Sequence, residues 1–510
     1  MQTSYTINYM KIYFWQGISI LMNFLSMLIV IPRLSDNPVI YGIYVVCISA
    51  NMFLTYADLG FASAGYKYAS EFVAKNDLEG EIKIVGFIGF LLLLFVILFS
   101  IIVSVISLNP SLIITNINSA IEHDIASKLL LTLALFSPFI IIQRIVSIIY
   151  GIRLEQYMIQ RIMIGANILK VFSVFYFFQS ASYDIVGYYL FCQIVNLSAI
   201  ITCLILVRTR YDISLFKLFG AFKYSKYAYN KTKALAFGSL FRIITWIMYF
   251  ELDVFVIAKY FGAESVAQYA IGFMILSFFR TIFGVLFAPF NARFNHFIAL
   301  NDKTGLRTIF KNTIIVTLPI VVFPIVSLLV LMEPIMNTWV GSYYDNSVLI
   351  AQFLIFVYIF ASFNFPTSIL ITAQEKIKAI YITSAILPIV HWTGIILMVS
   401  QFGILSFAMS KFIAMLLNSI LLLYFVMKSV SLSIKELMVG IIVPIILPIM
   451  ILISILIYLS PLMPVEKNSY NLMIVVFTGG LTSFIAILAY SVFSRHFRKY
   501  VLALIIKLNK

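Results

Sequence analysis

The stretch IKIVGFIGFLLLLFVILFSIIVSVISL, residues 82–108, decides the fold class of this chain. Its only charged residue is Lys83. A helix of this length would extend about 40 Å, more than the roughly 30 Å hydrocarbon core of a bilayer. The whole chain has the same character, since its 510 residues are 62% hydrophobic and 11% charged, whereas a soluble domain is about 25% charged. We therefore expect an all-α, polytopic integral membrane protein.

Apolar segments of about 20 residues recur along the whole sequence and predict about fourteen transmembrane helices. No loop between them is long enough for a sizeable soluble domain. The expected spans are 11–33, 38–60, 82–108, 128–150, 157–180, 184–207, 233–260, 265–291, 308–332, 347–372, 377–400, 403–427, 437–460 and 471–493.

The basic residues predict the orientation of these spans. With the N-terminus inside, 26 of the 35 lysines and arginines fall in cytoplasmic segments and four on the opposite side. Positive charge accumulates in cytoplasmic loops, so we expect both termini in the cytoplasm and the protein in the inner (cytoplasmic) membrane. The net charge of +15 then reflects orientation and contact with anionic lipid rather than nucleic-acid binding.

The sequence carries no motif that predicts an enzyme or a cofactor. It lacks a P-loop, an HExxH zinc motif and a G-x-S-x-G elbow. Cys47, Cys192 and Cys203 lie in apolar runs without a pairing pattern. The N-terminal MQTSYTINYM has no basic region or cleavage site, so we do not expect a removable signal peptide. We expect a non-enzymatic protein without metal or cofactor.

Two short matches indicate an internal repeat. FVAKND at 72–77 recurs as FIALND at 297–302, and YGIY at 41–44 recurs as VAQY at 266–269, both at an offset of 225. Six helices fit within this offset, so the copies run parallel about an axis along the membrane normal. The expected domains are an N-terminal six-helix lobe at 1–208, a basic cytoplasmic linker at 209–232, a C-terminal six-helix lobe at 233–428, and two additional helices with a basic tail at 429–510.

Five basic residues lie within the expected spans, where charge is costly. Only Glu251 and Asp253 oppose them at depth, with Asp58 near a cytoplasmic end. Each cation could instead pair with an acid or carbonyl and lock helices together. The surplus nevertheless predicts either an anion supplied from outside or a water-filled cavity. The five residues are Arg144, Lys170, Arg242, Arg280 and Lys411.

The seventh expected span combines a cation, aromatic rings and acids. On a continuous helix, one face carries Arg242, Trp246, Tyr249 and Asp253, and the opposite face carries Glu251. An arginine fork suits phosphate oxygens, and aromatic rings suit the C–H face of a sugar. Packing is the alternative for both rings. We expect Asp253 to act in ion coupling and Glu251 to be structural, although both could simply neutralise arginines.

His391, in the expected span 377–400, is expected to be a packed core histidine, with a proton role as the alternative.

These segments resemble the Wzx-type O-antigen and polysaccharide flippases of the multidrug/oligosaccharidyl-lipid/polysaccharide exporter superfamily. The resemblance lies in IPRLSDNPVIYGIYVV at 31–46, YADLGFASAGYKYASEF at 56–72 and ELDVFVIAKYFGAESVAQYAIGF at 251–273. Ala267 and Gln268 depart from the family pattern, in which a glycine is typical. The residues that match the family motifs are Tyr41–Gly42, Asp58–Leu59–Gly60, and Asp253 with Gly262 and Tyr269.

The resemblance implies a flippase that moves undecaprenyl-pyrophosphate-linked oligosaccharide to the outer leaflet by alternating access, as in O-antigen and lipopolysaccharide biosynthesis. It implies contact with membrane lipids, a coupling proton or Na⁺, and polymerase and chain-length partners. The expected pyrophosphate ligands are Arg242, Arg280, Lys170, Lys411 and Arg144, the sugar contacts are Trp246 and Tyr249, and the ion-coupling acids are Asp253 and Glu251. A drug/cation antiporter of the same superfamily is the alternative, followed by a polysaccharide polymerase or ligase.

Overall fold

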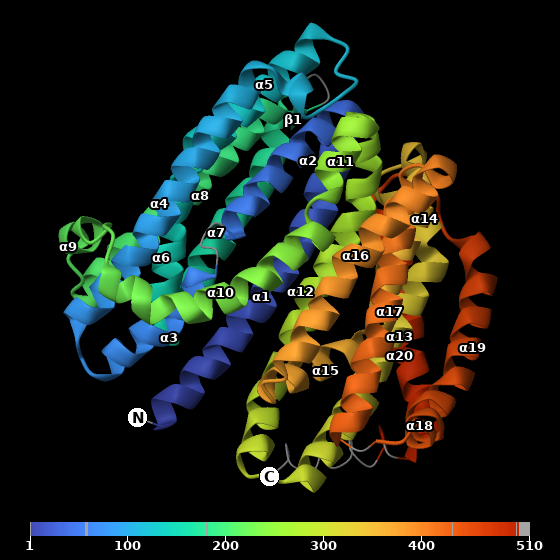
Figure 1. The fold of residues 1–510 in the computed structure, drawn as a ribbon. Helices are drawn as coiled ribbons and strands as arrows, with labels where there is room; N and C mark the ends of the chain where they lie inside the picture. Colours follow the sequence, from blue (N-terminus) through green and yellow to red (C-terminus); the bar gives the residue numbers. More distant parts are fainter. Residues whose placement is uncertain (1, 57–59, 180–181, 431, 496, 499–510) are drawn as a thin grey trace. The chain divides into compact units, whose positions relative to one another are not determined.

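The computed structural model describes residues 2–56, 60–179, 182–430, 432–495 and 497–498 (Figure 1). The chain forms two compact units, Met1–Ala267 and Gln268–Lys510. Their boundary falls within the first turns of one long helix, α12 (Ala263–Ala299). Asp58 and Leu59, which belong to the family motif, lie outside the described residues.

Among its described residues, the first unit contains eleven complete α-helices and a small two-stranded antiparallel sheet, in which Phe178 pairs with Tyr183. The helices are α1 (Gln2–Leu34), α2 (Pro38–Phe53), α3 (Phe61–Ala74), α4 (Leu78–Leu108), α5 (Ala120–Phe136), α6 (Phe139–Ile152), α7 (Tyr157–Phe177), α8 (Ile185–Tyr211), α9 (Leu215–Gly220), α10 (Lys226–Phe250) and α11 (Asp253–Tyr260). The short elements are 3₁₀ turns η1 (Leu54–Tyr56) and η2 (Pro110–Leu112), and strands β1 (Phe178–Gln179) and β2 (Ser182–Tyr183).

Within this unit, α1 lies along α7, α4 packs against α5, and α6 packs against α8. An apolar core runs between α3, α4, α6 and the end of α8, and includes the fully buried Phe87 and Tyr150. α10 packs on α3, and α11 packs on α2. The repeat assigns α10 and α11 to the second lobe, whereas their contacts lie in the first unit. The lobe boundaries stay a prediction. The repeat states which helices of the two halves match in sequence, whereas the two units are defined by spatial contacts.

The second unit holds the remaining helices. They are α12 (Ala263–Ala299), α13 (Lys303–Trp339), α14 (Asp345–Phe356), α15 (Ala361–Ala373), α16 (Ile377–Phe402), α17 (Leu405–Val430), α18 (Ile434–Leu437), α19 (Val443–Leu459) and α20 (Ser469–Phe493). Short elements join them: η3 (Ser342–Tyr344), η4 (Val357–Phe360), the π-helical turn η5 (Met438–Ile442) and η6 (Ser460–Leu462).

Helix α13 is the centre of the second unit, because it packs against α14, α15, α19 and α20. α16 lies along α17, which also contacts α14 and α15. The two additional C-terminal helices are therefore attached through α13. One polar contact fixes this attachment, since the Ser327 and Ser483 hydroxyls lie 2.7 Å apart and are buried.

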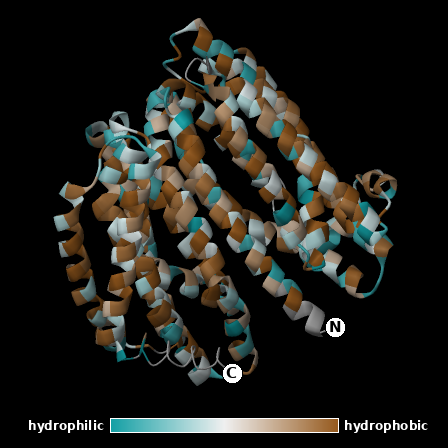
Figure 2. Ribbon diagram, turned by 180° about the vertical axis from the view of Figure 1, so that it is seen from behind, coloured by the Kyte–Doolittle hydropathy of each residue, from teal (hydrophilic) through white to brown (hydrophobic). Residues whose placement is uncertain are grey.

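The helices confirm an all-α, multi-pass membrane protein. Among the described residues, 12 helices are long and apolar enough to cross a membrane, and 13 if the bent pair α5 and α6 counts as one span. Figure 2 shows hydrophobic residues along the helices of each unit. The count is close to the fourteen expected. The segment expected as the seventh span is not among them. It is also not one continuous helix, since α10 ends at Phe250 and α11 begins at Asp253.

The two segments whose sequences match at the offset of 225 share their turn geometry. Asn76 and Asn301 both have a left-handed backbone, with φ of 56° and 52°. In each copy the following aspartate caps the next helix, since the carboxylate of Asp77 accepts from the Gly80 amide and that of Asp302 from the Gly305 amide, both at 2.8 Å. Asparagine tolerates the left-handed region and aspartate is a preferred N-cap, which explains why these two residues recur.

Candidate substrate-binding site

Two helices of the first unit are interrupted within apolar segments. The helix α2 gives way to the 3₁₀ turn η1, and α3 begins only after Gly60, which has a left-handed backbone with φ of 86°. The second interruption is at residues 251–252, between α10 and α11. Breaks in membrane helices release backbone polar groups and characterise the binding sites of many transporters.

The two interruptions are joined by a hydrogen bond and a ring contact. The hydroxyl of Tyr56, in η1, donates to a carboxylate oxygen of Glu251 at 3.2 Å. Beside it, the rings of Phe53 and Phe255 meet edge to face with centroids 5.3 Å apart. Glu251 is only 7% exposed, so this hydrogen bond helps to satisfy an acid that would be costly to bury alone.

The start of α3 lies directly against α10. A Cβ atom at Gly60 would lie 2.6 Å from the carbonyl oxygen of Ala236, so only glycine fits without a shift of the backbone. The hydroxyls of Ser63 and Ser239 lie 3.2 Å apart. The glycine therefore serves two purposes, because it supplies both the left-handed conformation and the close approach of the two helices.

A pocket of about 390 Å³ opens beside the break in the second span. Arg242 supplies a positive charge, Trp246 supplies an indole that is 39% exposed, and three residues supply hydroxyl groups. Such a lining can bind an anion and stack on an apolar face. The lining residues are Tyr56, Gly60, Ser63, Ser239, Arg242, Ile243 and Trp246.

Arg144 supports the same segment from α6. Its guanidinium donates to the carbonyl oxygen of Thr55 at 2.6 Å, and the side chain is half-buried. Thr55 precedes Tyr56, so Arg144 holds the turn that carries a lining residue. This contact with a carbonyl matches the helix-locking alternative for Arg144.

Lys170 lies apart from this pocket. It belongs to α7, and its ammonium donates to the side-chain oxygen of Asn196 on α8 at 3.0 Å. The structure thus brings Arg144 and Arg242 to one segment of the first unit, and places Lys170 in a separate pair of helices of that unit.

The remaining two expected cations belong to the second unit. Arg280 lies on α12 and is half-buried. Lys411 is fully buried on α17, with its ammonium 5.7 Å from the ring centroid of Phe273 on α12. Immediately before Lys411 in the chain, the Ser410 hydroxyl lies 2.9 Å from Nδ1 of the fully buried His391. His391 is therefore a buried, hydrogen-bonded histidine.

The helix break separates Asp253 from the other three residues of the expected stripe, which all lie on α10. Arg242 and Trp246 line the pocket, whereas Tyr249 and Asp253 are fully buried and are not among the lining residues. The Tyr249 ring packs against Phe250 with centroids 4.6 Å apart. Asp253 opens α11, where unpaired backbone N–H groups favour a carboxylate. A helical wheel that assumes one continuous helix across residues 251–252 therefore gives the wrong direction for the side chain of Asp253 relative to α10.

The three hydroxyl-bearing lining residues, Tyr56, Ser63 and Ser239, were not predicted from the sequence. Their contacts cross more than 170 positions of the chain, so no local pattern marks them. Gly60, at the end of an otherwise apolar span, was a usable signal for the break. Among the described residues, no group of three or more His, Cys, Asp or Glu could hold a metal ion.

No protein-family model matches the chain, and no curated protein matches it in sequence. Among solved structures, it is similar to lipid II flippase MurJ in an inward-closed conformation, with a TM-score of 0.68 and 16% identity over 95% of this chain and 99% of that one. An inward-facing multidrug resistance transporter of the MATE family matches with a TM-score of 0.62 and 12% identity over 81% and 94%. A MOP-superfamily transporter from Pyrococcus furiosus matches with a TM-score of 0.55 and 14% identity over 82% and 94%. The chain therefore has the fold of the MOP-superfamily transporters.

Proposed function

We propose that this protein is a flippase that moves undecaprenyl-pyrophosphate-linked oligosaccharide from the cytoplasmic to the outer leaflet of the inner membrane by alternating access. The observation that carries the proposal is the pocket at the break of the second span, where Arg242 and Trp246 meet hydroxyl groups. Two of the residues expected from the sequence to contact pyrophosphate and sugar thus line one pocket. The likeness in fold to a protein described as a lipid II flippase also supports a lipid-linked substrate.

In this proposal Arg242 makes the first contact with the pyrophosphate. Its planar fork can donate two parallel hydrogen bonds to phosphate oxygens. Trp246 lies one turn further along α10 and offers its exposed face to the adjacent sugar. Tyr56, Ser63 and Ser239 can donate to phosphate or sugar oxygens. Arg144 acts through η1 as a positioning residue, because its guanidinium holds the Thr55 carbonyl.

Lys170, Arg280 and Lys411 complete the proposed set of pyrophosphate ligands, used at other stages of the transport cycle. Tyr249 is proposed to contact sugar when the segment around 251–252 rearranges. Asp253 is the proposed site of a coupling proton or Na⁺, and Glu251 supports it by holding Tyr56 at 3.2 Å. The proposed topology places both termini in the cytoplasm, with the six-helix lobes at 1–208 and 233–428.

A drug/cation antiporter is the second candidate, because MATE-family transporters share the fold. A cationic drug favours a carboxylate in its site, whereas the described residues that line this pocket include an arginine and no acid. The charge of the lining therefore favours an anionic substrate. A polymerase or ligase is less well supported, since the matched structures are transporters.

The discriminating experiment uses the full-length protein in liposomes. A fluorescent undecaprenyl-pyrophosphate oligosaccharide is placed in both leaflets, and the fraction that becomes accessible to an external quencher is followed in time. We expect protein-dependent flipping of the pyrophosphate lipid and no protein-dependent uptake of a cationic dye such as ethidium. Dye uptake driven by a proton or sodium gradient, without lipid flipping, would establish the antiporter instead.

A further inference from the structure

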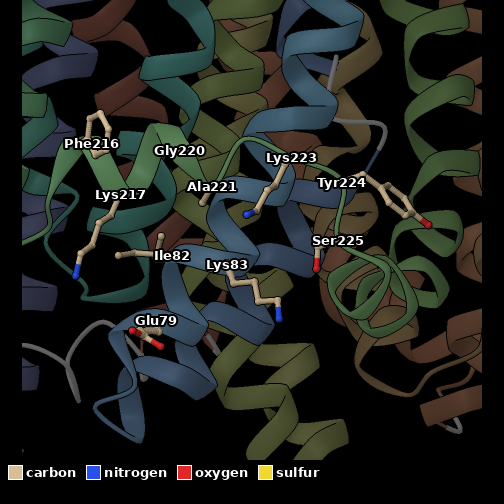
Figure 3. Close-up of a pocket in the computed structure, with 10 residues that line it drawn as sticks. All are labelled: Glu79, Ile82, Lys83, Phe216, Lys217, Gly220, Ala221, Lys223, Tyr224 and Ser225. Carbon is tan, nitrogen blue, oxygen red and sulfur yellow. The ribbon is translucent and has the colours of Figure 1, made fainter.

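The segment between helices α8 and α10 lines a second pocket, separate from the candidate substrate site. It has a volume of about 560 Å³ and lies between the start of α4, helix α9 and the loop that leads into α10. Figure 3 shows Lys217 on α9, Lys223 on the following loop and Lys83 on α4 around it, with Glu79 at the beginning of α4.

Close packing holds this segment against α4. Leu218 of α9 is only 1% exposed and belongs to the apolar core of the first unit. A Cβ atom at Gly86 would lie 2.5 Å from the Ala221 side chain, and one at Gly89 would lie 2.6 Å from the Phe222 ring. Two glycines on one face of α4 thus allow the loop to pack closely against this helix. The pocket is therefore formed by tightly packed residues and not by a loosely attached connection.

The outward side of α9 and of the loop after it carries exposed aromatic residues. Phe216 is 90% exposed, the highest value among the described large hydrophobic side chains, and Tyr224 is 59% exposed. Both residues line the pocket. In a segment that joins two membrane helices, an exposed phenylalanine next to lysines matches the pattern of interfacial segments, in which apolar side chains enter the boundary between headgroups and acyl chains.

The charge of the pocket is positive. The exposed lysines Lys83, Lys217 and Lys223 oppose a single acid, Glu79. The Lys83 ammonium lies 5.1 Å from the ring centroid of Tyr227, at the start of α10, and this cation–π contact restrains it. A site with three ammonium groups, one carboxylate and an apolar rim complements a phosphate group that carries hydrocarbon.

We propose that this pocket binds the phosphate headgroup of an anionic phospholipid, with Phe216 seated among the adjoining acyl chains. The site is distinct from substrate binding and would anchor the connection between α8 and α10 to the membrane surface. Each lysine near an anionic surface contributes about 1 kcal/mol, a factor of about five in affinity. Removal of all three should therefore weaken binding by about a hundredfold.

The test measures binding of phosphatidylglycerol to the purified full-length protein in neutral detergent by native mass spectrometry. The pocket variant carries Lys83→Gln, Lys217→Gln and Lys223→Gln. The matched control carries Lys303→Gln, Lys378→Gln and Lys435→Gln, three exposed lysines of the second unit, and has the same net charge. We expect a loss of about a hundredfold in the pocket variant and less than twofold in the control. An equal loss in both would overturn the proposal, because it would indicate diffuse attraction.

Two further arms identify the ligand. Phosphatidylcholine with the same acyl chains should bind at least tenfold more weakly than phosphatidylglycerol, and equal binding would contradict recognition of an anionic headgroup. Inorganic phosphate should compete only at far higher concentration, and Phe216→Ser should weaken binding of the lipid without affecting phosphate. If phosphate alone binds as tightly as the lipid, the site is an anion site without a membrane role. Unchanged size-exclusion profiles establish that the variants are folded.

Discussion

The hydroxyl of Tyr56 donates to the carboxylate of Glu251 at 3.2 Å. The two residues are 195 positions apart in the sequence, and their hydrogen bond connects two helix interruptions within apolar segments. Each partner is placed by its own helix break, since Tyr56 ends η1 and Glu251 caps the C-terminus of α10. This relationship explains why an apolar segment keeps Glu251. The acid accepts a hydrogen bond from another helix beside the proposed substrate pocket.

The hydrogen bond between Tyr56 and Glu251 leads us to expect different losses of stability for variants of its two partners. Tyr56→Phe removes the donor and leaves a buried acceptor short of one bond, so it should destabilise the protein by about 1–3 kcal/mol and slow transport. Glu251→Gln retains an amide oxygen that can accept, so it should cost less than Glu251→Ala. Thermal unfolding in detergent measures both. Equal destabilisation by the glutamine and alanine variants would show that Glu251 acts through its charge instead.

The left-handed backbone at Gly60 predicts a position where alanine is not tolerated. A Cβ there would cost about 1–2 kcal/mol in backbone strain and would meet the Ala236 carbonyl at 2.6 Å. Gly60→Ala should therefore lower both the unfolding temperature and the transport rate. Gly238 of α10 provides the control, because a Cβ at that position meets nothing within 4 Å. Gly238→Ala should be neutral or stabilising by about 0.5–1 kcal/mol. Equal behaviour of both variants would contradict the described break.

The buried ion pair between Arg153 and Glu81, which do not line the proposed site, predicts a large loss of stability when it is broken. The Arg153 guanidinium makes two hydrogen bonds of 2.7 Å with the Glu81 carboxylate, and the two side chains are 16% and 3% exposed. Arg153→Ala would leave a buried charge without this partner and should destabilise by about 3–5 kcal/mol. Lys128→Ala breaks an exposed pair with Asp124, 58% exposed on both sides, and should cost less than about 1 kcal/mol. Chemical denaturation of both variants compares the two pairs.

The Glu155 carboxylate predicts a dependence of stability on pH. Burial tends to raise its pKa, but hydrogen bonds from Arg210 and Tyr211 outweigh burial and hold the pKa below its ordinary value of 4.5. A folded-state pKa below the unfolded one stabilises the fold above the unfolded value, and this stabilisation is lost as the pH falls through the folded pKa. The difference in unfolding temperature between wild type and Glu155→Gln should be constant above about pH 5.5 and shrink below about pH 4.5. A difference that is independent of pH would show that this carboxylate is not linked to folding.

The ion-coupling proposal concerns Asp253. Asp253→Asn keeps the size and hydrogen-bonding capacity of the side chain but cannot bind and release a proton. We expect the variant to insert normally and to lose the response of lipid flipping to an imposed proton or sodium gradient. The assay compares rates in liposomes with and without each gradient. A full response to both gradients in Asp253→Asn would remove the coupling role.

Much of the fold was predictable because hydropathy reports directly which segments can lie in a bilayer. The matched segments FVAKND and FIALND form turns of the same geometry, since asparagine and aspartate have local backbone preferences that recur with the sequence. The placement of Arg242 and Trp246 on one face was predictable because both lie within the unbroken helix α10.

The helix breaks were not predictable in the same way. The hydropathy of a segment does not show whether its helix is continuous, so the segments around Tyr56 and Glu251 were predicted as unbroken spans. The contacts made at these breaks come from distant parts of the chain, as in the pairs Tyr56–Glu251 and Ser63–Ser239. For that reason Asp253 was expected on the stripe of Arg242, whereas it opens a new helix.

The measurement that tests the central claim most directly is the rate of flipping of an undecaprenyl-pyrophosphate oligosaccharide by Arg242 variants in liposomes. Loss of a charged hydrogen-bonding group costs about 1.5–3 kcal/mol, so Arg242→Ala should flip the lipid roughly ten- to a hundredfold more slowly than wild type. Arg242→Lys should recover only part of the rate, because an ammonium cannot form the bidentate fork. The control Arg293→Ala removes an exposed arginine of α12 and should flip at the wild-type rate. Wild-type flipping by Arg242→Ala, at equal amounts of inserted protein, would contradict the account.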